Sequence, residues 1–259
     1  MPEGDTIYRT AEVMRRTLRH DQVVAARGRP GGAQLARIVG SHVKGVSTRG
    51  KHLLIGFDNG LTLHTHLQMH GTWHRYRPGE GWRLQAGEAV AVVETPWAVA
   101  VCFRAPTVEL VETRALPLHP ALSRLGPDLL DEGFDLEEGV ARLSGSRKTV
   151  SEALLDQRLV AGIGNVYRSE VLAQERIDPF ARAAELSSAT LRRVLLSARA
   201  LLRANLDGRE RATVPDAPRG ARWVYRRAGR PCRRCGALIR SQGFGQPPRT
   251  VYWCPACQA

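Results

Sequence analysis

Two closely spaced cysteine pairs near the C-terminus constrain the fold more than any other feature of this sequence. Cys232 and Cys235 form one Cys-x2-Cys pair, Cys254 and Cys257 form a second, and 18 residues separate the two pairs. Such pairs are typical of a tetrahedral zinc site with four thiolate ligands. A redox dithiol would account for one pair but not for two matched ones. The spacing therefore predicts one structural Zn²⁺ ion with no coordination position left for catalysis.

The residues around these cysteines predict a small module that depends on its metal. Residues 219–259 are basic and have little apolar periodicity, so their core is too small to order them alone. Structural zinc binding can contribute roughly 10–16 kcal/mol to such a module. Between the pairs, Ala237–Ile239 and Thr250–Trp253 can form a hairpin. Arginines beside the cysteines, including Arg249, favour nucleic acid as the partner.

The charge of the chain supports a polyanionic partner. The sequence of 259 residues has a formal net charge of +13. Clustered cations gain affinity for nucleic acid by releasing phosphate counterions, so we expect a DNA- or RNA-binding protein. The sequence has no apolar run of about 18 residues and no signal-peptide order at its start, so we expect no membrane association. A cytoplasmic, nucleoid-associated monomer is the predicted state.

Hydrophobic periodicity divides the chain into three zones. Apolar residues from Ile7 to Leu18 recur at helical spacing, and Asp5 or Thr6 can cap that helix. Residues 22–110 contain short Val-, Thr- and Leu-rich stretches separated by glycines, which predict a β-sandwich. Helical patterns follow a Pro-rich connection at 115–133, over 150–159, 166–175 and 186–206. The predicted class is α+β multidomain: an N-terminal helix plus β-sandwich (1–116), a helical domain (117–218) and a zinc-ribbon hairpin (219–259).

The first residues carry a possible nucleophile. Removal of Met1 would expose the secondary amine of Pro2, and an α-amino group near pKa 8 has an appreciable neutral fraction in the cell. Such an amine can attack a sugar C1′ to give an iminium ion, and the adjacent Glu3 can act as general acid or base. From these residues alone, a frayed terminus without a role explains the pattern better.

Five segments in order resemble the formamidopyrimidine-DNA glycosylase/endonuclease VIII family, most closely its endonuclease VIII-type members. The segments span nearly the whole chain and are Met1–Gly4, Thr48–Leu54, Leu125–Leu130, Leu159–Glu170 and Tyr252–Cys257. The resemblance implies that Pro2 forms a Schiff base and that Glu3 helps to open the sugar ring. It also implies a helix-two-turn-helix motif in the helical domain, in which Asn165 binds backbone phosphate. Lys51 takes the family's phosphate-binding lysine position, and Arg249 takes that of the zinc-hairpin arginine.

The family must extrude the damaged nucleotide, and the resemblance indicates which residues fill the gap. Gln68, Met69 and His70 follow a strand pattern directly and precede Gly71, which allows a tight turn. Met69 is the expected apolar wedge. The alternative is a metal site formed by His64, His66 and His70. It is disfavoured because no carboxylate lies in that segment.

The predicted function is that of a bifunctional glycosylase/lyase of base-excision repair. It would excise oxidised bases, with pyrimidines favoured, from double-stranded DNA, and single-stranded DNA stays open as a substrate. Strand cleavage would follow by β- and δ-elimination. Many family members carry Pro where this chain has Asp5, and an acidic residue where it has Thr6. Two rivals stay open: a non-catalytic nucleic-acid-binding protein on the same fold, and an enzyme whose amine comes from Lys51.

Overall fold

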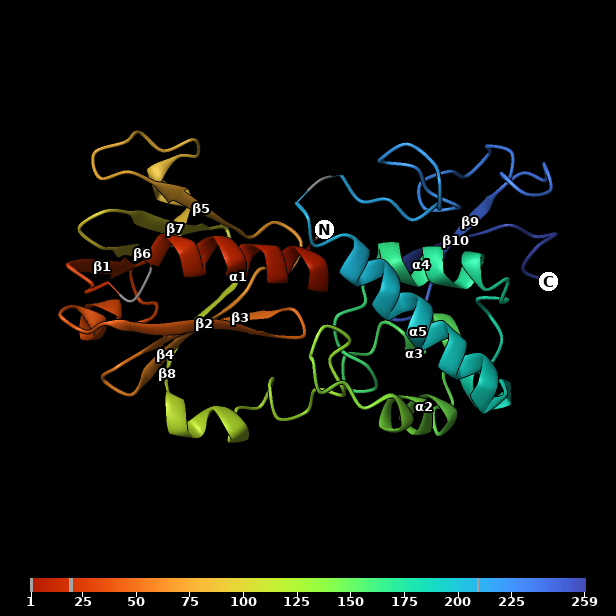
Figure 1. Ribbon diagram of the computed structural model, residues 1–259, viewed down its shortest axis with the longest axis horizontal. Helices are drawn as coiled ribbons and strands as arrows, with labels where there is room; N and C mark the ends of the chain where they lie inside the picture. The colour runs from red at the N-terminus through yellow and green to blue at the C-terminus, as the bar shows by residue number, and fades with distance from the viewer. Residues whose placement is uncertain (1, 19–20, 209) are drawn as a thin grey trace. The chain divides into compact units, whose positions relative to one another are not determined.

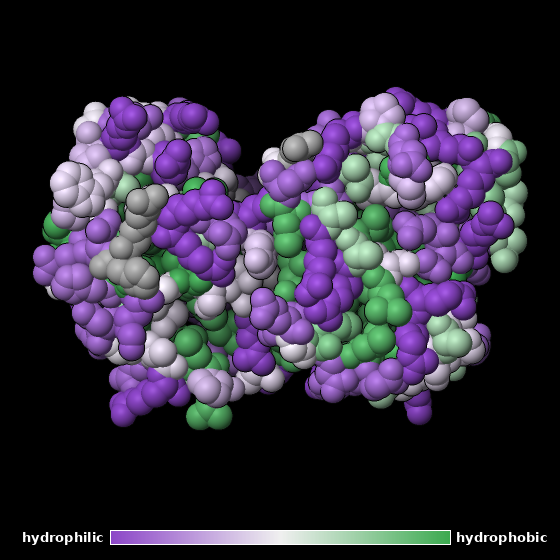
Figure 2. All heavy atoms as spheres, in the orientation of Figure 1, coloured by the Kyte–Doolittle hydropathy of each residue, from purple (hydrophilic) through white to green (hydrophobic). Residues whose placement is uncertain are grey.

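The computed structural model describes residues 2–18, 21–208 and 210–259, which form two compact units. Unit 1 comprises residues 1–124 and unit 2 comprises residues 125–259. Figure 1 shows the strands of two sheets and one long helix in unit 1, and a group of helices with a short hairpin in unit 2. Hydrophilic side chains cover most of the face shown in Figure 2, as expected for 38 basic and 25 acidic residues. Among the described residues, no helix is both long and apolar enough to cross a bilayer.

Unit 1 is a helix packed with two four-stranded antiparallel sheets. The helix is α1 (Gly4–Leu18). One sheet has the order β1-β6-β7-β5 and the other β2-β3-β4-β8. The strands are β1 (Ala25–Gly28), β2 (Val43–Arg49), β3 (His52–Phe57), β4 (Leu61–His66), β5 (Thr72–Tyr76), β6 (Ala89–Glu94), β7 (Val99–Phe103) and β8 (Thr107–Glu112). Short 3-10 turns are η1 (Leu35–Ile38), η2 (Ala86–Glu88) and η3 (Thr113–Leu118).

The core of unit 1 confirms the predicted helix and sandwich. Ile7, Ala11 and Met14 of α1 are at most 1% exposed and belong to one cluster with residues from both sheets. The helix begins at Gly4, where the Glu3 carbonyl accepts from the Thr6 and Ile7 amides at 2.9 and 3.1 Å. The cap predicted at Asp5 or Thr6 was therefore wrong, because these residues already lie within the first turn.

Unit 2 is built from helices and ends in the cysteine hairpin. Its helices are α2 (Leu136–Ser144), α3 (Val150–Ala153), α4 (Asn165–Gln174) and α5 (Ser188–Ala204), with the 3-10 turn η4 (Ala183–Glu185). Thr149 and Glu152 form a capping box at α3, and the Ser187 side chain caps α5. The apolar sides of these helices share one core. β9 (Arg240–Phe244) pairs antiparallel with β10 (Arg249–Trp253).

The hairpin packs on α4 through a small apolar cluster. Ala173 near the end of α4 meets Val224, Ile239 and two of the cysteines there. In addition, the Gln258 side chain donates to the Ile177 carbonyl at 2.9 Å. The cysteine module and the helices therefore belong to the same compact unit.

Candidate functional site

The four C-terminal cysteines lie in a zinc-finger arrangement. Their sulfur atoms all lie within 4.8 Å of one another. The Sγ atoms of Cys235 and Cys254 are 3.4 Å apart, and those of Cys232 and Cys257 are 4.0 Å apart. A tetrahedral ion with bonds of about 2.3 Å to thiolate sulfur would hold its ligands about 3.8 Å apart. The donor set and its spacing therefore fit a closed, four-thiolate metal site.

Arg234, which lies between the two cysteines of the first pair, fixes the module to α4. Its guanidinium donates to the carbonyls of Ala173 and Gln174, the latter at 3.2 Å, and lies 4.0 Å over the ring of Trp223. Carbonyls at a helix C-terminus carry partial negative charge and favour a cation. Arg234 therefore has a structural partner within unit 2.

The turn before α4 is joined to the hairpin by hydrogen bonds. Asn165, the first residue of α4, donates from its side-chain amide to the Thr250 carbonyl of β10 at 3.2 Å. Arg168, one turn later, donates to the same carbonyl at 2.7 Å and also to the Asn165 side chain. Asn165 is 8% exposed and Arg168 is 1% exposed. Unit 2 thus brings Asn165 next to Thr250, the neighbour of the exposed Arg249.

A cavity of about 340 Å³ lies beside this junction. Its wall is predominantly cationic, and the charged residues that line it are Lys148, Glu152, Asp156, Arg158, Arg168 and Arg249. Lys148 and Arg158 both bind Asp156 at 2.7 Å. The Arg158 hydrogen bonds hold the pKa of Asp156 well below its usual range, and Lys148 adds to the effect. One acid thus orders two cations, which suits an anion such as a backbone phosphate.

Glu170 was not predicted as an individual site residue, yet it organises the approach to the cysteine module. This carboxylate is fully buried and accepts from the backbone amides of Trp223, Val224 and Tyr225 at 2.7–2.9 Å. The Thr213 hydroxyl donates to it as well. A buried carboxylate is stable when several donors replace its water, so Glu170 anchors the segment that leads to Cys232.

In unit 1, Pro2 precedes two buried carboxylates. Pro2 is half-buried, and Glu3 and Asp5 are both 0% exposed. The Asp5 carboxylate lies 3.5 Å from the Arg9 guanidinium one turn along α1, and Thr6 donates to it at 3.4 Å. The Asp5 carboxylate that departs from the common family pattern thus has cationic and hydroxyl partners within the helix. Pro2 itself stands just before the N-terminus of α1, where the helix dipole is positive.

Lys51 lies at the tip of the hairpin between β2 and β3. Arg49 pairs with His52, so Gly50 and Lys51 form a two-residue turn, and Gly50 adopts a φ of +58°. The His52 and His66 rings stack at 4.5 Å behind this turn. Burial lowers the pKa of His52 to about 3, helped by the nearby His66, and burial together with Lys51 lowers that of His66 to about 4. Both rings are therefore neutral beside the Lys51 ammonium.

The predicted wedge forms an exposed turn after β4. Gln68, Met69 and His70 are exposed, Met69 by 44%. Gln68 has a φ of +47°, and the Gly71 amide closes the turn on the Leu67 carbonyl at 2.8 Å. A Cβ at residue 71 would lie 2.5 Å from that carbonyl oxygen, so glycine is required there. The sequence prediction of a tight turn is confirmed.

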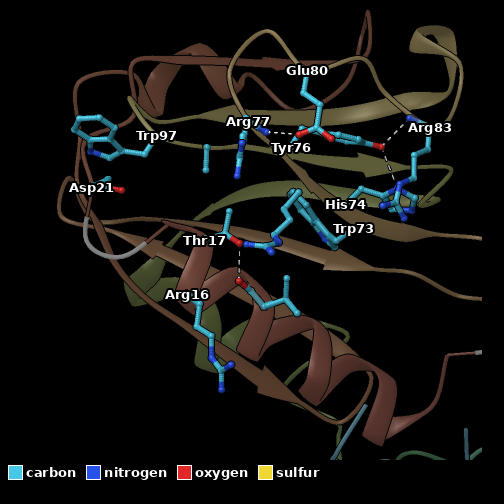
Figure 3. A pocket seen from close by; sticks show the side chains of 13 residues that line it. Arg16, Thr17, Asp21, Trp73, His74, Tyr76, Arg77, Glu80, Arg83 and Trp97 are labelled. Atoms are coloured by element: carbon cyan, nitrogen blue, oxygen red, sulfur yellow. Dashed lines mark hydrogen bonds between the residues drawn. The ribbon is translucent and has the colours of Figure 1, made fainter. Parts of the chain in front are cut away.

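Another cavity, of about 980 Å³, lies in unit 1, and its lining includes none of Pro2, Lys51 and Met69. Figure 3 shows its lining, with Arg16 and Thr17 on α1, Arg77 and Arg83 around β5, and Trp97 at one side. Thr17 lies about 20 Å along the helix from Pro2, at a rise of about 1.5 Å per residue. The cavity therefore lies toward the opposite end of α1 from Pro2.

The sandwich with its N-terminal helix, the turn-and-helix motif at Asn165 and the four-cysteine hairpin together define a class of DNA-repair fold. A model of the formamidopyrimidine-DNA glycosylase N-terminal domain matches residues 1–110, and a model of the H2TH domain of the same glycosylase matches residues 125–215. The chain belongs to the formamidopyrimidine-DNA glycosylase/endonuclease VIII family and is similar to its endonuclease 8 members.

Relatives align with the chain over its full length. A probable endonuclease 8 2 of Streptomyces coelicolor is 38% identical, over 100% of this chain and 94% of that protein. Endonuclease 8 of Escherichia coli is 34% identical over 100% of both chains. A DNA-(apurinic or apyrimidinic site) lyase Nei2 of Mycolicibacterium smegmatis is 35% identical, over 100% and 99%.

Solved structures agree with the same fold. Lactococcus lactis formamidopyrimidine-DNA glycosylase, bound to DNA that contains an AP site, superposes with a TM-score of 0.85 at 22% identity over 99% of each chain. The structure of the same glycosylase with DNA that contains an oxidised pyrimidine superposes with a TM-score of 0.86 at 23% identity, again over 99% of each chain. The predicted α+β fold with a helical motif and cysteine hairpin is confirmed.

Proposed function

We propose that the chain is a DNA glycosylase and AP lyase of base-excision repair in the bacterial cytoplasm, acting through the Pro2 amine. The observation that carries the proposal is the position of Pro2 before a fully buried Glu3 at the start of α1, in a chain that aligns end to end with endonuclease 8 proteins. The four cysteines would hold one structural Zn²⁺ ion. Damaged double-stranded DNA is the proposed partner of a monomer.

In the proposed reaction the neutral Pro2 nitrogen attacks C1′ of the damaged nucleotide. The base leaves with the electrons of its glycosidic bond and takes up a proton, while Glu3 protonates the ring oxygen as the sugar opens. The resulting iminium ion accepts electrons when a C2′ proton is removed. The 3′ phosphate then leaves by β-elimination, and removal of a C4′ proton lets the 5′ phosphate leave by δ-elimination. Water hydrolyses the remaining imine and returns the Pro2 amine.

The remaining site residues divide between holding DNA and opening it. Lys51, Asn165 and Arg249 would contact backbone phosphates, which position the substrate without reading its sequence. Gln68, Met69 and His70 would fill the space left by the extruded nucleotide. The preference for oxidised pyrimidines rests on the resemblance to endonuclease 8. Comparing excision of an oxidised pyrimidine with excision of 8-oxo-G, in duplex and in single strands, tests that preference directly.

Borohydride trapping on abasic DNA tests the amine. Reduction of a Schiff base should give a covalent adduct, and tryptic mass spectrometry should locate it on the peptide that begins at Pro2 and ends at Arg9. An adduct on the peptide that contains Lys51 would instead support the lysine. The protein must first be shown to begin at Pro2, because a retained Met1 turns that nitrogen into an unreactive amide.

Variants separate the remaining rivals. Pro2→Gly should reduce trapping strongly, whereas Lys51→Ala should weaken DNA binding and leave trapping at saturating protein detectable. If no adduct forms with verified Pro2, the chain is a non-catalytic DNA-binding protein on this fold. That rival predicts that Pro2→Gly and the original chain bind abasic DNA with equal affinity and that neither cleaves the strand.

A further inference from the structure

Strand pairing brings a histidine of β4 to a carboxylate that is distant in sequence. His64 lies directly opposite Glu109 of β8 in the antiparallel register. Its Nδ1 atom is 2.9 Å from Glu109 Oε2, and Nε2 of His119, just after η3, is 3.0 Å from the same oxygen. The carboxylate that the segment around His64 lacks is therefore supplied by the neighbouring strand.

The histidines do not form the His64, His66 and His70 group that the sequence analysis disfavoured. His66 stacks on His52, and His70 lies in the exposed turn after β4. The three potential ligands His64, Glu109 and His119 instead place their donor atoms within 4.8 Å of one another. We propose that His64, Glu109 and His119 form a second metal site, for a divalent transition ion such as Zn²⁺, separate from the four cysteines.

The chemistry of the three groups suits such an ion. Two imidazoles and one carboxylate, with positions open to water, form a recurrent three-ligand set for zinc and related ions. Bonds of about 2.1 Å in a tetrahedral site would place the donor atoms about 3.4 Å apart. The present separations of 2.9 and 3.0 Å would need to widen by only a few tenths of an ångström.

The hydrogen bonds around the site define its proton balance. Without metal, both rings donate to Glu109, and His52 Nδ1 donates to His64 Nε2 at 2.8 Å. When the metal takes Nδ1 of His64, that proton moves to Nε2, and His52 changes tautomer from Nδ1–H to Nε2–H so that its Nδ1 accepts from His64. His119 gives up an acceptor contact of 3.3 Å from the Ala121 amide. The imidazoles stay neutral throughout, so they need to release no proton.

The exposure of the three side chains indicates which parts of unit 1 an ion would join. The His64 side chain is 1% exposed, that of His119 is 14% exposed and that of Glu109 is 46% exposed. The site therefore has a buried inner ligand on β4 and its most exposed ligand, Glu109, on β8, while the mostly buried His119 belongs to the segment that ends unit 1 at residue 124. Metal binding would fasten that segment to the sheet.

Metal titration of the zinc-loaded protein tests the proposal. We expect equilibrium dialysis against Zn²⁺ to give two ions per chain. Co²⁺ added after the cysteine site is filled should show d–d absorption without thiolate charge transfer. Glu109→Gln and His119→Ala should each keep only the ion at the cysteines. Their affinity for the second ion should fall more than about 100-fold, because changes even to residues outside the ligand set of a metal site lower affinity 10- to 100-fold.

Matched variants complete the test. Glu112→Gln lies on the same strand and His42→Ala removes an exposed histidine, so both should keep two ions. Zn²⁺ should also slow tryptic cleavage after Arg124 in the original chain but not in Glu109→Gln. A single ion in the original chain, or a second ion that persists in both Glu109→Gln and His119→Ala, would overturn the proposal. Unchanged cleavage with two ions bound would refute the fastening of the segment.

Discussion

The side-chain amide of Asn165 donates to the Thr250 carbonyl at 3.2 Å, and this bond ties the turn before α4 to the cysteine hairpin. Residue 250 follows Arg249 directly, so the proposed phosphate-binding residues Asn165 and Arg249 are positioned by one local network. Arg168 reinforces it from a fully buried position. A change at Asn165 should therefore affect the hairpin as well as the DNA.

Asn165→Ala and Arg249→Ala should both weaken binding to all DNA sequences, by about 10-fold each, because one phosphate contact of this kind contributes about 1.5 kcal/mol. Only Arg249→Ala should lower the slope of log affinity against log salt, by about 0.9. Fluorescence anisotropy over a salt series measures both quantities. Arg192→Ala removes an equal charge from α5 and serves as the control. Equal slopes for Arg249→Ala and the original chain would contradict the assignment.

Glu170→Gln should destabilise unit 2 by at least about 2 kcal/mol. The carboxylate accepts from three backbone amides, whereas a glutamine offers one carbonyl and turns its NH₂ group toward a donor. Urea unfolding measures the loss. Glu132→Gln, at an exposed position, should change stability little. If the two variants unfold alike, Glu170 has no anchoring role.

The contribution of Asp156 to stability should depend on pH. Its cationic partners depress the pKa of the folded carboxyl, so the unfolded chain binds the proton more tightly. The stabilisation is present above the ordinary Asp pKa of about 3.9 and is lost as the pH falls toward the lower folded value. Asp156→Asn should cost about 1 kcal/mol at pH 7, and this difference should shrink below about pH 4. Urea unfolding across pH measures it, with exposed Asp216→Asn as control; a constant difference would argue against this account.

Met69→Ala should slow base excision from duplex DNA by about 10-fold, because a wedge offsets part of the few kcal/mol that extrusion costs. The same variant should process an abasic site in single-stranded DNA at the original rate. Met69→Leu, which keeps the apolar volume, should retain most duplex activity. Single-turnover kinetics on the two substrates distinguish the cases. An equal loss on both would indicate a role other than opening the duplex.

Cys235→Ser should remove the thiolate-bound ion and with it the order of the hairpin, since little apolar core remains there to replace the metal. Co²⁺ substitution should give a thiolate charge-transfer band in the original chain and a weakened one in the variant. DNA affinity should fall in parallel. Cys102→Ala alters a buried strand thiol in unit 1 and should leave the band unchanged. A band of full intensity in Cys235→Ser would rule out a four-thiolate site.

Local periodicity was sufficient to predict much of the fold. The apolar spacing from Ile7 onward predicted α1, and the short Val-, Thr- and Leu-rich stretches of residues 22–110 predicted the sandwich whose core includes Leu61 and Leu63. α2 was missed, although Asp135 caps it and Val140 and Leu143 are buried. The helix predicted over 150–159 ends as a regular helix at Ala153, since the chain turns there toward α4. The first strand of the hairpin was predicted at Ala237–Ile239, but it lies at Arg240–Phe244. The prediction missed it because β9 is mostly exposed and has no apolar pattern.

The site could be predicted only where one motif carried it. The cysteine pairs and the turn before Gly71 are local, so their spacing was enough. The pairing of His64 with Glu109 depends on the register between strands 45 residues apart, which no local pattern encodes. The backbone partners of Glu170 lie more than 50 residues later and Thr213 lies 43 residues later, so local patterns could not identify them either. Sequence thus shows which groups exist, while long-range pairing decides which of them meet.

The crowding at Gly71 has a consequence for engineering the proposed wedge. Because a side chain at residue 71 would collide with the Leu67 backbone, the loop that presents Gln68, Met69 and His70 has a fixed length and a fixed closing residue. Libraries that vary the proposed wedge should change those three side chains and leave residue 71 as glycine. Insertions there would move the tip of the loop and alter every contact at once.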